Sequence, residues 1–366
     1  MPPASPHDRQ PCAFDPCEYS RQVPFSCGLD ATYSVGENLS GLGVYSREIL
    51  AGLARAHPEQ RFRYYYRPRP LLKSLRETLP SNATRRPLLG APRVDLFHSL
   101  SQRVDQPARR TISTFHDLFV MSGDYSTPDF RARFTEQARR AAGHSDAIIA
   151  VSEFTASQIV QLLGYERSRI HVVPHGVHAV APSAAARENL ILFVGVIQRR
   201  KNVARLVQAF EHVPAGWRLA LAGAARGFGA EEQLRAVQES PRRADVEILG
   251  HLSREQLDGL YARARIFAFP SLDEGFGIPV LEAMAHGVPV VTSNCSAMPE
   301  VAGDAALLVD PLDVEDIGSA LARLATDESL REHFIRRGRE RAGQFSWDAA
   351  VARTWAIYEK VLAANK

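Results

Sequence analysis

The chain has 366 residues, which at roughly 100–200 residues per domain indicates two domains. Hydrophobic residues make up 45% and charged residues 23%, an ordinary balance for a globular protein, and no apolar run reaches the roughly 18 residues of a membrane-spanning helix. The formal net charge of +3 is too small to indicate a nucleic-acid partner, so none is expected.

Residues 1–24 form a polar, proline-rich tail that we expect to be mobile. The tail lacks the basic start and apolar stretch of a signal peptide, so we expect a cytoplasmic protein in a reducing environment. Cys12 and Cys17 lie in this tail without a histidine pair at zinc spacing, and no metal site is expected. Cys27 lies in an apolar run and is expected in the core.

After the tail, short apolar runs alternate with helical patterns. A helix is predicted over residues 44–56, where Tyr45, Ile49 and Leu53 recur at helical spacing. Strands are predicted in the first half over residues 25–30, 61–66, 94–98, 110–115, 147–151 and 170–173. In the second half, strands over 190–194, 218–222, 246–249, 266–269, 288–292 and 306–308 alternate with helices over 203–210, 230–239, 254–264, 280–285 and 314–325.

This alternation predicts an α/β fold made of two Rossmann-like domains that face each other across a cleft. The first domain is expected over residues 25–182 and the second over 183–346, with a last helix in 347–366. Pro174, Gly176 and Pro182 punctuate the join. Ligands bind at the carboxyl ends of strands in such sheets, which places the site in the cleft.

The segment from Glu274 to Glu282 has the pattern of an anion-binding loop. It follows an apolar strand and leads into a helix through Gly275, Phe276, Gly277 and Ile278. Glycines let the backbone approach a ligand, and free N–H groups at a helix start point at phosphate oxygens. The two carboxylates would accept hydrogen bonds from hydroxyl groups, so a phosphate between two polyols fits. The spacing alone fits equally an ordinary turn with two glutamates in water.

A second polar cluster follows the strand predicted over 190–194. Arg200 and Lys201 come shortly after Gly195, and Asn202 is expected to cap the next helix. Cations fixed at the carboxyl end of a strand can neutralise the charge on a departing diphosphate. The alternative is a basic turn exposed to water.

The first domain offers two weaker candidates. Gly41 and Gly43 lie between the first strand and the first helix, where backbone N–H groups could carry phosphate, or where the glycines merely give a flexible helix entry. His116 follows a strand and could bind a sugar hydroxyl, or it is a core histidine fixed by Asp117.

The stretch from Arg61 to Arg93 carries nine basic residues and few acidic ones, with aromatic residues between them. Two interpretations remain open: a surface exposed to water, or a basic face that contacts the anionic headgroups of a membrane. The second would place the protein at the inner face of the membrane.

Together these motifs resemble, in the right order, those of the family 4 retaining glycosyltransferases, which have the GT-B fold. The likeness runs from about Phe25 to Leu362 and is most specific between Phe269 and Pro311. It also includes Ala150-Val151-Ser152-Glu153-Phe154, Val173-Pro174-His175-Gly176-Val177, Pro299-Glu300-Val301 and Phe345-Ser346-Trp347.

The resemblance implies a role for each candidate residue. Glu282 accepts hydrogen bonds from the donor's ribose, Glu274 contacts the donor sugar, and the backbone from Gly275 to Ile278 meets the sugar and the distal phosphate. Arg200, Lys201 and the loop after Gly195 hold the diphosphate as a leaving group, with Gly41 and Gly43 approaching it from the first domain. His116 lies beside the donor sugar, and His251 and Leu252 hold the base.

The resemblance also implies that the helix from Trp347 crosses back to the first domain. One departure is Val196, where many members have Arg; the resemblance then leaves Arg200 and Lys201 as the cations of this loop that hold the diphosphate. This pattern resembles that of bacterial surface-polysaccharide enzymes and favours a mannose-type sugar on GDP, although a UDP-linked donor stays open.

The implied function is a metal-independent, retaining transfer of a hexose to a glycan or polyprenyl-linked acceptor, with no cofactor. Charge stabilisation and positioning would supply the catalysis, since no protein nucleophile is evident. The alternatives are a non-catalytic nucleotide-sugar-binding protein and an epimerase or phosphorylase of the same fold.

Overall fold

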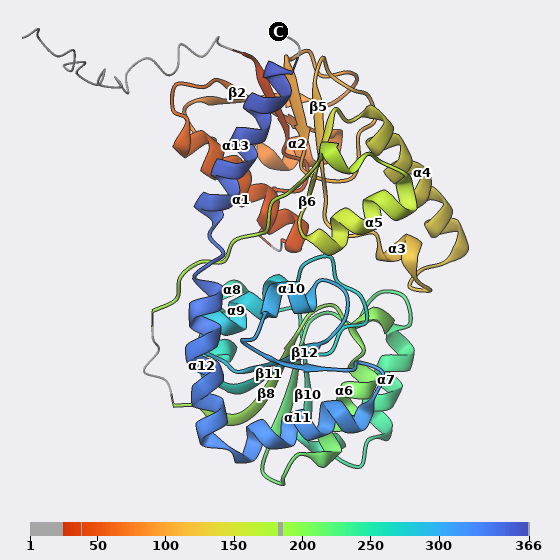
Figure 1. Ribbon diagram of the computed structural model, residues 1–366, viewed down its shortest axis with the longest axis vertical. Helices are drawn as coiled ribbons and strands as arrows, with labels where there is room; N and C mark the ends of the chain where they lie inside the picture. The colour runs from red at the N-terminus through yellow and green to blue at the C-terminus, as the bar shows by residue number, and fades with distance from the viewer. Residues whose placement is uncertain (1–24, 38, 182–185, 365–366) are drawn as a thin grey trace, which may run out of the picture.

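The structure, a computed structural model, describes residues 25–37, 39–181 and 186–364, which form two α/β domains stacked along the long axis (Figure 1). The predicted tail and the predicted domain boundary at residues 182–183 lie outside the described residues. Within these ranges, no helix combines the length and apolar character needed to cross a membrane.

In the part of the first domain that is described, seven strands form one parallel sheet in the order β3-β2-β1-β4-β5-β6-β7. The strands are β1 (Cys27–Asp30), β2 (Phe62–Tyr66), β3 (Ala83–Pro87), β4 (Leu96–Ser99), β5 (Thr111–Phe115), β6 (Ala147–Ala150) and β7 (Ile170–Val172). The sequence did not predict β3, because this polar edge strand has little apolar alternation. Cys27 is fully buried in the core, as expected.

Helices cover both faces of this sheet, as its buried strands require. They are α1 (Gly41–Ala56), α2 (Pro68–Ser74), α3 (Phe119–Ser122), α4 (Pro128–His144) and α5 (Glu153–Leu163). Buried side chains of α1 share a core with one face, and those of α4 and α5 share a core with the other. Helix α1 begins at Gly41 rather than at Val44, because the side chain of Ser40 accepts a hydrogen bond from the N–H of Gly43.

The second domain has a six-stranded parallel sheet, within the described residues, in the order β10-β9-β8-β11-β12-β13. Its strands are β8 (Glu188–Val194), β9 (Arg218–Ala222), β10 (Val246–Gly250), β11 (Ala264–Phe269), β12 (Val290–Ser293) and β13 (Leu307–Val309). Its helices are α6 (Val203–Ala209), α7 (Ala230–Glu239), α8 (Arg254–Arg263), α9 (Ile278–Ala285), α10 (Met298–Ala302), α11 (Val314–Thr326) and α12 (Glu328–Ala342). Each predicted strand of this half is present, with bounds shifted by up to two residues.

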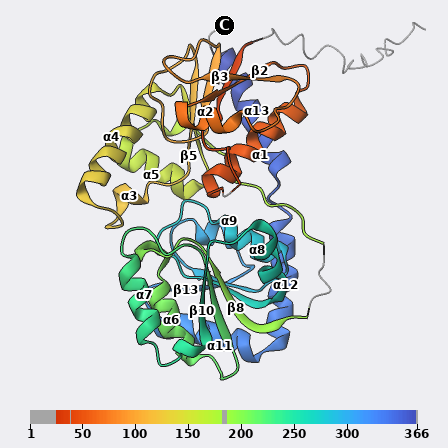
Figure 2. The ribbon, with the colours of Figure 1, turned by 180° about the vertical axis from the view of Figure 1, so that it is seen from behind.

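The last helix, α13 (Trp347–Ala363), leaves the second domain and lies along α1 of the first (Figures 1 and 2). A Cβ on Gly52 of α1 would lie 2.4 Å from a methyl group of Val351, so the two helices meet at a glycine. Two turns further along α13, the hydroxyl of Tyr358 lies 2.6 Å from Nδ1 of His98 on β4. The predicted α/β architecture and the predicted return of the last helix are therefore confirmed.

Candidate active site

The basic loop after β8 is built into the second domain through Asn202. Arg199–Lys201 form a short 3-10 helix, and Asn202 follows with a φ of 59°, a left-handed conformation that asparagine tolerates. The expected helix cap by the Asn202 side chain is wrong. Its amide instead donates to the carbonyls of Pro270 at 2.9 Å and Pro311 at 2.6 Å, so it fastens together the loops that follow β8, β11 and β13.

Arg200 and Lys201 contact Glu274 directly. Arg200 Nη1 lies 2.7 Å from one carboxylate oxygen of Glu274, and Lys201 Nζ lies 2.5 Å from the other. All three side chains are about nine-tenths buried, with 9–10% of each exposed. The two residues predicted to hold the diphosphate and the residue predicted to hold the sugar thus form one ion-paired cluster.

Aromatic rings from both domains border this cluster. The guanidinium of Arg200 lies 4.2 Å from the ring centre of Phe119 in the first domain, a cation–π contact. Lys201 Nζ lies 4.5 Å from the ring centre of Phe269 at the end of β11. Low-dielectric surroundings of this kind strengthen the attraction between the ions.

Burial and neighbouring charges shift the pKa values of this cluster and of two nearby carboxyl groups. Burial works to raise the pKa of Glu274, but Arg200 and Lys201 outweigh it and lower that pKa to about 2. Burial lowers the pKa of Lys201 to about 8 against the opposing effect of Glu274, so the pair is ionised at neutral pH. Burial also raises the pKa of Asp117 to about 6, and it raises that of Asp273.

Asp117 and Asp273 are therefore two carboxyl groups of this site that the sequence did not single out. Asp273 accepts a hydrogen bond of 2.9 Å from the hydroxyl of Ser122 in the first domain, and Arg200 donates to the Asp273 carbonyl at 2.5 Å. Asp117 did follow a predicted strand, but nothing in the sequence placed it beside Arg200.

His116 lies on the first-domain side of the interface, within an aromatic cluster. Its Nε2 lies 3.0 Å from the carbonyl of Leu100, its ring stacks on His175 at 5.4 Å, and Tyr45 of α1 meets it edge-on at 4.7 Å. Burial lowers the pKa of His116 to about 4, so the ring is neutral at pH 7. Because Nε2 faces a carbonyl, it carries the proton, which leaves Nδ1 as the acceptor.

The loop after Glu274 packs tightly against the first domain. A Cβ on Gly275 would lie 1.7 Å from the carbonyl oxygen of His116, so this contact requires glycine. Phe276 is buried against His175, with ring centres 4.9 Å apart. Gly277 has a φ of 106° and directly precedes α9, whose first residue is Ile278. The predicted strand–loop–helix setting of this segment is present.

Glu282 lies in the second turn of α9 and is paired separately from Glu274. It forms an ion pair with Arg254 and accepts a hydrogen bond of 3.1 Å from the hydroxyl of Tyr261. Arg254 begins α8, directly after the loop that holds exposed His251 and half-buried Leu252. The residues predicted to bind ribose and base therefore lie on neighbouring elements. Nothing in the sequence indicated that Arg254 pairs with Glu282.

The three remaining glycines differ in setting. Gly41 and Gly43 form the first turn of α1, and a Cβ on Gly43 would lie 2.9 Å from the Tyr33 carbonyl, whereas one on Gly41 would meet nothing within 4 Å. Gly195 follows β8, with the Lys201 side chain 3.4 Å from where its Cβ would be. The structure thus brings Gly195 to the ion-paired cluster and places Gly41 and Gly43 in the helix that carries Tyr45.

Comparison with known proteins shows which family this arrangement belongs to. Residues 32–180 match the family model "Glycosyltransferase Family 4", and residues 180–341 match "Glycosyl transferases group 1". O-antigen chain mannosyltransferase B of Escherichia coli is 33% identical over 282 residues, 72% of this chain and 74% of that protein. MMP alpha-(1->4)-mannosyltransferase of Mycolicibacterium hassiacum is 33% identical over 239 residues, 63% of this chain and 58% of that protein.

Solved structures agree on the fold. Sucrose-phosphate synthase from Thermosynechococcus elongatus aligns with a TM-score of 0.72 at 21% identity, over 93% of this chain and 100% of that one. WaaG, a glycosyltransferase involved in lipopolysaccharide biosynthesis, aligns with a TM-score of 0.65 at 16% identity, over 93% of this chain and 100% of that one. The chain therefore belongs to the family 4 glycosyltransferases of the GT-B fold and is similar to bacterial mannosyltransferases.

Proposed function

We propose that the protein transfers mannose or a related hexose from a GDP-sugar to a glycan or polyprenyl-linked acceptor in bacterial surface-polysaccharide synthesis, with retention of configuration. The observation that carries the proposal is the buried contact of Arg200 and Lys201 with Glu274 at the domain interface. The 33% identity to O-antigen chain mannosyltransferase B supports the choice of sugar and pathway.

The ion-paired cluster suits a diphosphate leaving group. Two buried cations at the carboxyl end of β8 can replace their contact with Glu274 by contacts with phosphate oxygens. Glu274 is then released to accept hydrogen bonds from sugar hydroxyls. In this proposal the fixed cations supply the positive charge that a metal ion would otherwise supply, and no cofactor takes part.

Glu282 suits the ribose for the same chemical reason. Its carboxylate accepts hydrogen bonds, and Tyr261 and Arg254 hold it in place. A nucleoside that contacts Glu282 would have its base near the loop of His251 and Leu252, which leads into Arg254. The donor would thus run from α8 to the ion-paired cluster, with the sugar beside His116.

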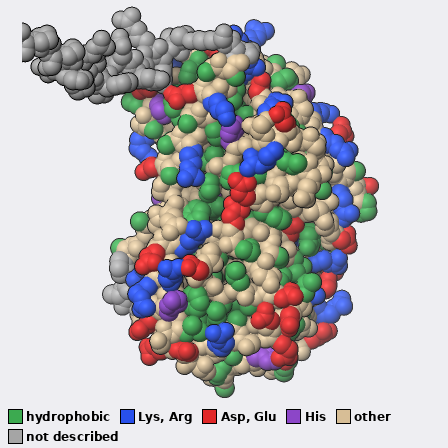
Figure 3. All heavy atoms as spheres, viewed as in Figure 1, with side chains coloured by type: hydrophobic (Ala, Val, Ile, Leu, Met, Phe, Trp, Pro, Cys, Tyr) green, Lys and Arg blue, Asp and Glu red, His purple; other side chains and the backbone are tan. Residues whose placement is uncertain are grey.

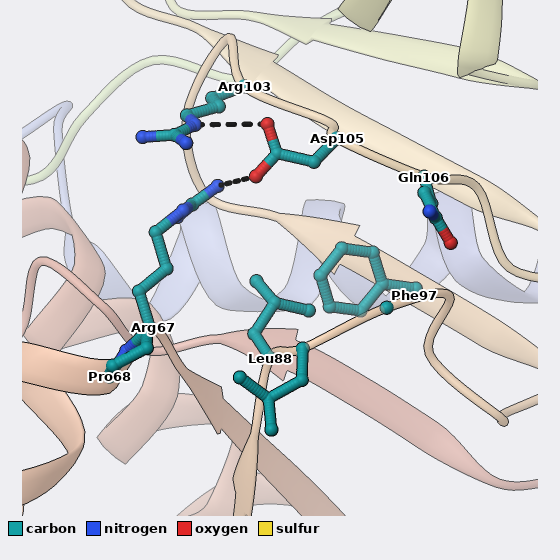
Figure 4. A pocket seen from close by; sticks show the side chains of 9 residues that line it. Arg67, Pro68, Leu88, Phe97, Arg103, Asp105 and Gln106 are labelled. Carbon is teal, nitrogen blue, oxygen red and sulfur yellow. Dashed lines mark hydrogen bonds and ion pairs between the residues drawn. The ribbon is translucent and has the colours of Figure 1, made fainter.

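We place the acceptor in a pocket of about 330 Å³ on the first domain (Figure 4). Arg67 bridges Asp30 and Asp105, and Arg103 also pairs with Asp105, so charged groups are held in fixed positions. Phe97 supplies an apolar wall. Such a mixture of hydrogen-bonding groups and an apolar wall suits a sugar ring. Asp30 is the last residue of β1 and Arg67 follows β2, at the sheet edge on which His116 also lies.

The proposal also includes a membrane contact through the stretch from Arg61 to Arg93. Leu72, Leu75 and Leu89 are 65–77% exposed there, among the exposed side chains of Arg69, Lys73, Arg76 and Arg86. The aromatic residues Phe62, Tyr64 and Tyr66 are core residues, so they do not contribute. Elsewhere, basic and acidic side chains are interspersed on the face in Figure 3. Flotation with anionic and neutral vesicles tests this contact, and Leu72→Ser should weaken it.

The test of the donor is a thermal-unfolding screen with GDP- and UDP-sugars, followed by transfer assays and NMR of the product's anomeric configuration. A donor at 100 times its Kd should stabilise the protein by about 2.7 kcal/mol. GDP-mannose should give the largest shift, and Glu282→Ala should abolish most of it. Undiminished transfer by Glu282→Ala, or inversion at the anomeric carbon, would contradict the proposal.

A further inference from the structure

Two sequence motifs that received no role above meet at the interface between the domains. Ser152 precedes α5 in the first domain and caps it by accepting a hydrogen bond from the N–H of Thr155 at 2.9 Å. Glu300 lies on α10 in the second domain, far along the chain. Three sets of hydrogen bonds connect these two elements and the loop after Glu274.

The carboxylate of Glu300 binds the N-terminus of α5. One oxygen accepts from the backbone N–H of Glu153 at 2.9 Å, and the other accepts from that of Phe154 at 3.2 Å. The first N–H groups of a helix have no partner within the helix, and the helix dipole favours a negative charge there. Here the charge comes from the opposite domain, so the bonds exist only while the domains are together.

The same end of α5 binds the loop that carries Glu274. The hydroxyls of Ser152 and Thr155 both donate to the carbonyl of Gly275, at 2.6 and 3.1 Å, and all of these groups are buried. The preceding peptide is held from within the second domain, because the N–H of Ala297, just before α10, donates to the carbonyl of Glu274 at 3.2 Å. The backbone on both sides of the Glu274–Gly275 bond is therefore fixed.

Glycine at position 275 is what allows this approach. Its missing Cβ would lie 1.7 Å from the His116 carbonyl and 3.0 Å from the side chain of Asp117. The loop is thus enclosed by β5's end and by α5 of the first domain. The residue just before this glycine is Glu274, whose carboxylate lies between Arg200 and Lys201.

We infer that Ser152, Thr155 and Glu300 form an interdomain clasp that positions the Glu274 loop when the two domains close. They are positioning residues that do not touch the donor. Their bonds to the Gly275 carbonyl and between the domains hold the loop that carries Glu274. The clasp couples domain closure to the assembly of the site, since an open protein loses the bonds that fix Gly275. This inference rests on the proposed function for its catalytic consequence, but not for its effect on closure.

The experiment compares the full chain with Glu300→Gln, Thr155→Val and Thr155→Ser. The control is Glu328→Gln, which alters an exposed glutamate in the first turn of α12, within one domain. Solution X-ray scattering of the ligand-free proteins measures the separation of the domains. We expect larger radii of gyration for Glu300→Gln and Thr155→Val, and wild-type values for Glu328→Gln and Thr155→Ser, because serine keeps the hydroxyl.

Kinetics with GDP-mannose and calorimetry with GDP separate positioning from a general loss of structure. The clasp predicts a fall in kcat of roughly tenfold or more in Glu300→Gln and Thr155→Val, about 1.4 kcal/mol in the barrier. The Kd for GDP should stay within about twofold, because most of its proposed contacts, those with Glu282, Arg200 and Lys201, lie on the second domain. Thr155→Ser, which keeps the hydroxyl, should have the wild-type kcat.

Two results would overturn the clasp. One is a wild-type radius of gyration in both Glu300→Gln and Thr155→Val, which would mean that these bonds do not hold the domains together. The other is an open variant with wild-type kcat, which would mean that closure by these bonds does not position the loop. If the wild-type chain transfers no sugar from any nucleotide donor, the proposed function fails, while the ligand-free scattering still decides whether the clasp closes the domains.

Discussion

Replacing Glu274 by glutamine removes one charge from the buried cluster while keeping the shape of the side chain. Arg200 and Lys201 would then be buried without their nearest counter-charge. Breaking a buried ion pair on one side costs about 3–5 kcal/mol. Because Asp117 and Asp273 remain nearby, we expect the lower end, about 3 kcal/mol.

This loss is large enough to measure as a change in melting temperature. A domain of 150–250 residues loses roughly 2–4 °C per kcal/mol, so Glu274→Gln should lower Tm by roughly 6–12 °C. The matched control is Glu282→Gln. Glu282 is 14% exposed, but its partner Arg254 is 54% exposed and can be solvated when the charge is removed, and glutamine keeps an oxygen for the Tyr261 hydroxyl. Pairs with such access to water contribute only about 0–1 kcal/mol. The control should therefore melt within about 4 °C of the wild type.

Inorganic pyrophosphate provides the second half of the test. In the wild type this anion competes with the Glu274 carboxylate for Arg200 and Lys201, whereas in Glu274→Gln it would be their strongest counter-charge. Pyrophosphate at pH 7 should therefore raise the Tm of Glu274→Gln more than that of the wild type. Equal melting of the two glutamine variants, or an equal pyrophosphate effect on variant and wild type, would refute the idea that Glu274 occupies the phosphate site.

Three further predictions follow from the geometry and the buried titrating groups. Gly275→Ala should force the domains apart, because its Cβ would lie 1.7 Å from the His116 carbonyl, and it should lower kcat by at least about tenfold. Gly41→Ala, whose Cβ would meet nothing within 4 Å, should leave the free energy of unfolding within about 1 kcal/mol of the wild-type value. A rise in donor KM in that variant would therefore report phosphate contact alone. Burial raises the pKa of Asp117 to about 6, so its carboxylate becomes neutral below that pH and no longer repels an anionic ligand. Calorimetry should therefore show several-fold tighter binding of an intact nucleotide sugar at pH 5.5 than at pH 7. This difference should be absent from Asp117→Asn. Burial lowers the pKa of His98 to about 3 and that of His116 to about 4, so these rings stay neutral in the folded protein while they bind protons in the unfolded chain. The free energy of unfolding should therefore be constant above pH 6.5 and fall as the pH drops from 6.5 toward 4, by about 3 kcal/mol from His116 alone. Urea titrations that show no such fall would contradict the buried, neutral state of these rings.

The strands of the second domain could be predicted from the sequence because they are buried on both faces. Residues 190–194 of β8 and 266–269 of β11 are continuous apolar runs, and the polar residues that follow them had to lie at one edge of a parallel sheet. That logic located Arg200, Lys201 and the Glu274 loop. It failed for β3, an exposed edge strand whose polar residues carry no apolar period.

The side-chain partners were decided only by tertiary structure. Asn202 was expected to cap its own helix, since sequence rules for caps are local, but its amide bridges two loops that lie 68 and 109 residues away in the chain. Arg254 was missed for the same reason, because its pairing with Glu282 joins α8 to α9. No local spacing encodes a contact of this kind.

The sequence by itself determined the α/β class, the family and the set of residues at the strand ends. These follow from hydrophobic periodicity and from motifs in which every member lies close along the chain. The tertiary structure alone decided that Glu274 lies between Arg200 and Lys201, and that Ser152 and Glu300 fasten the two domains around its loop. Such contacts depend on how two separately formed sheets face each other, a property of three-dimensional packing that no local pattern of residues contains.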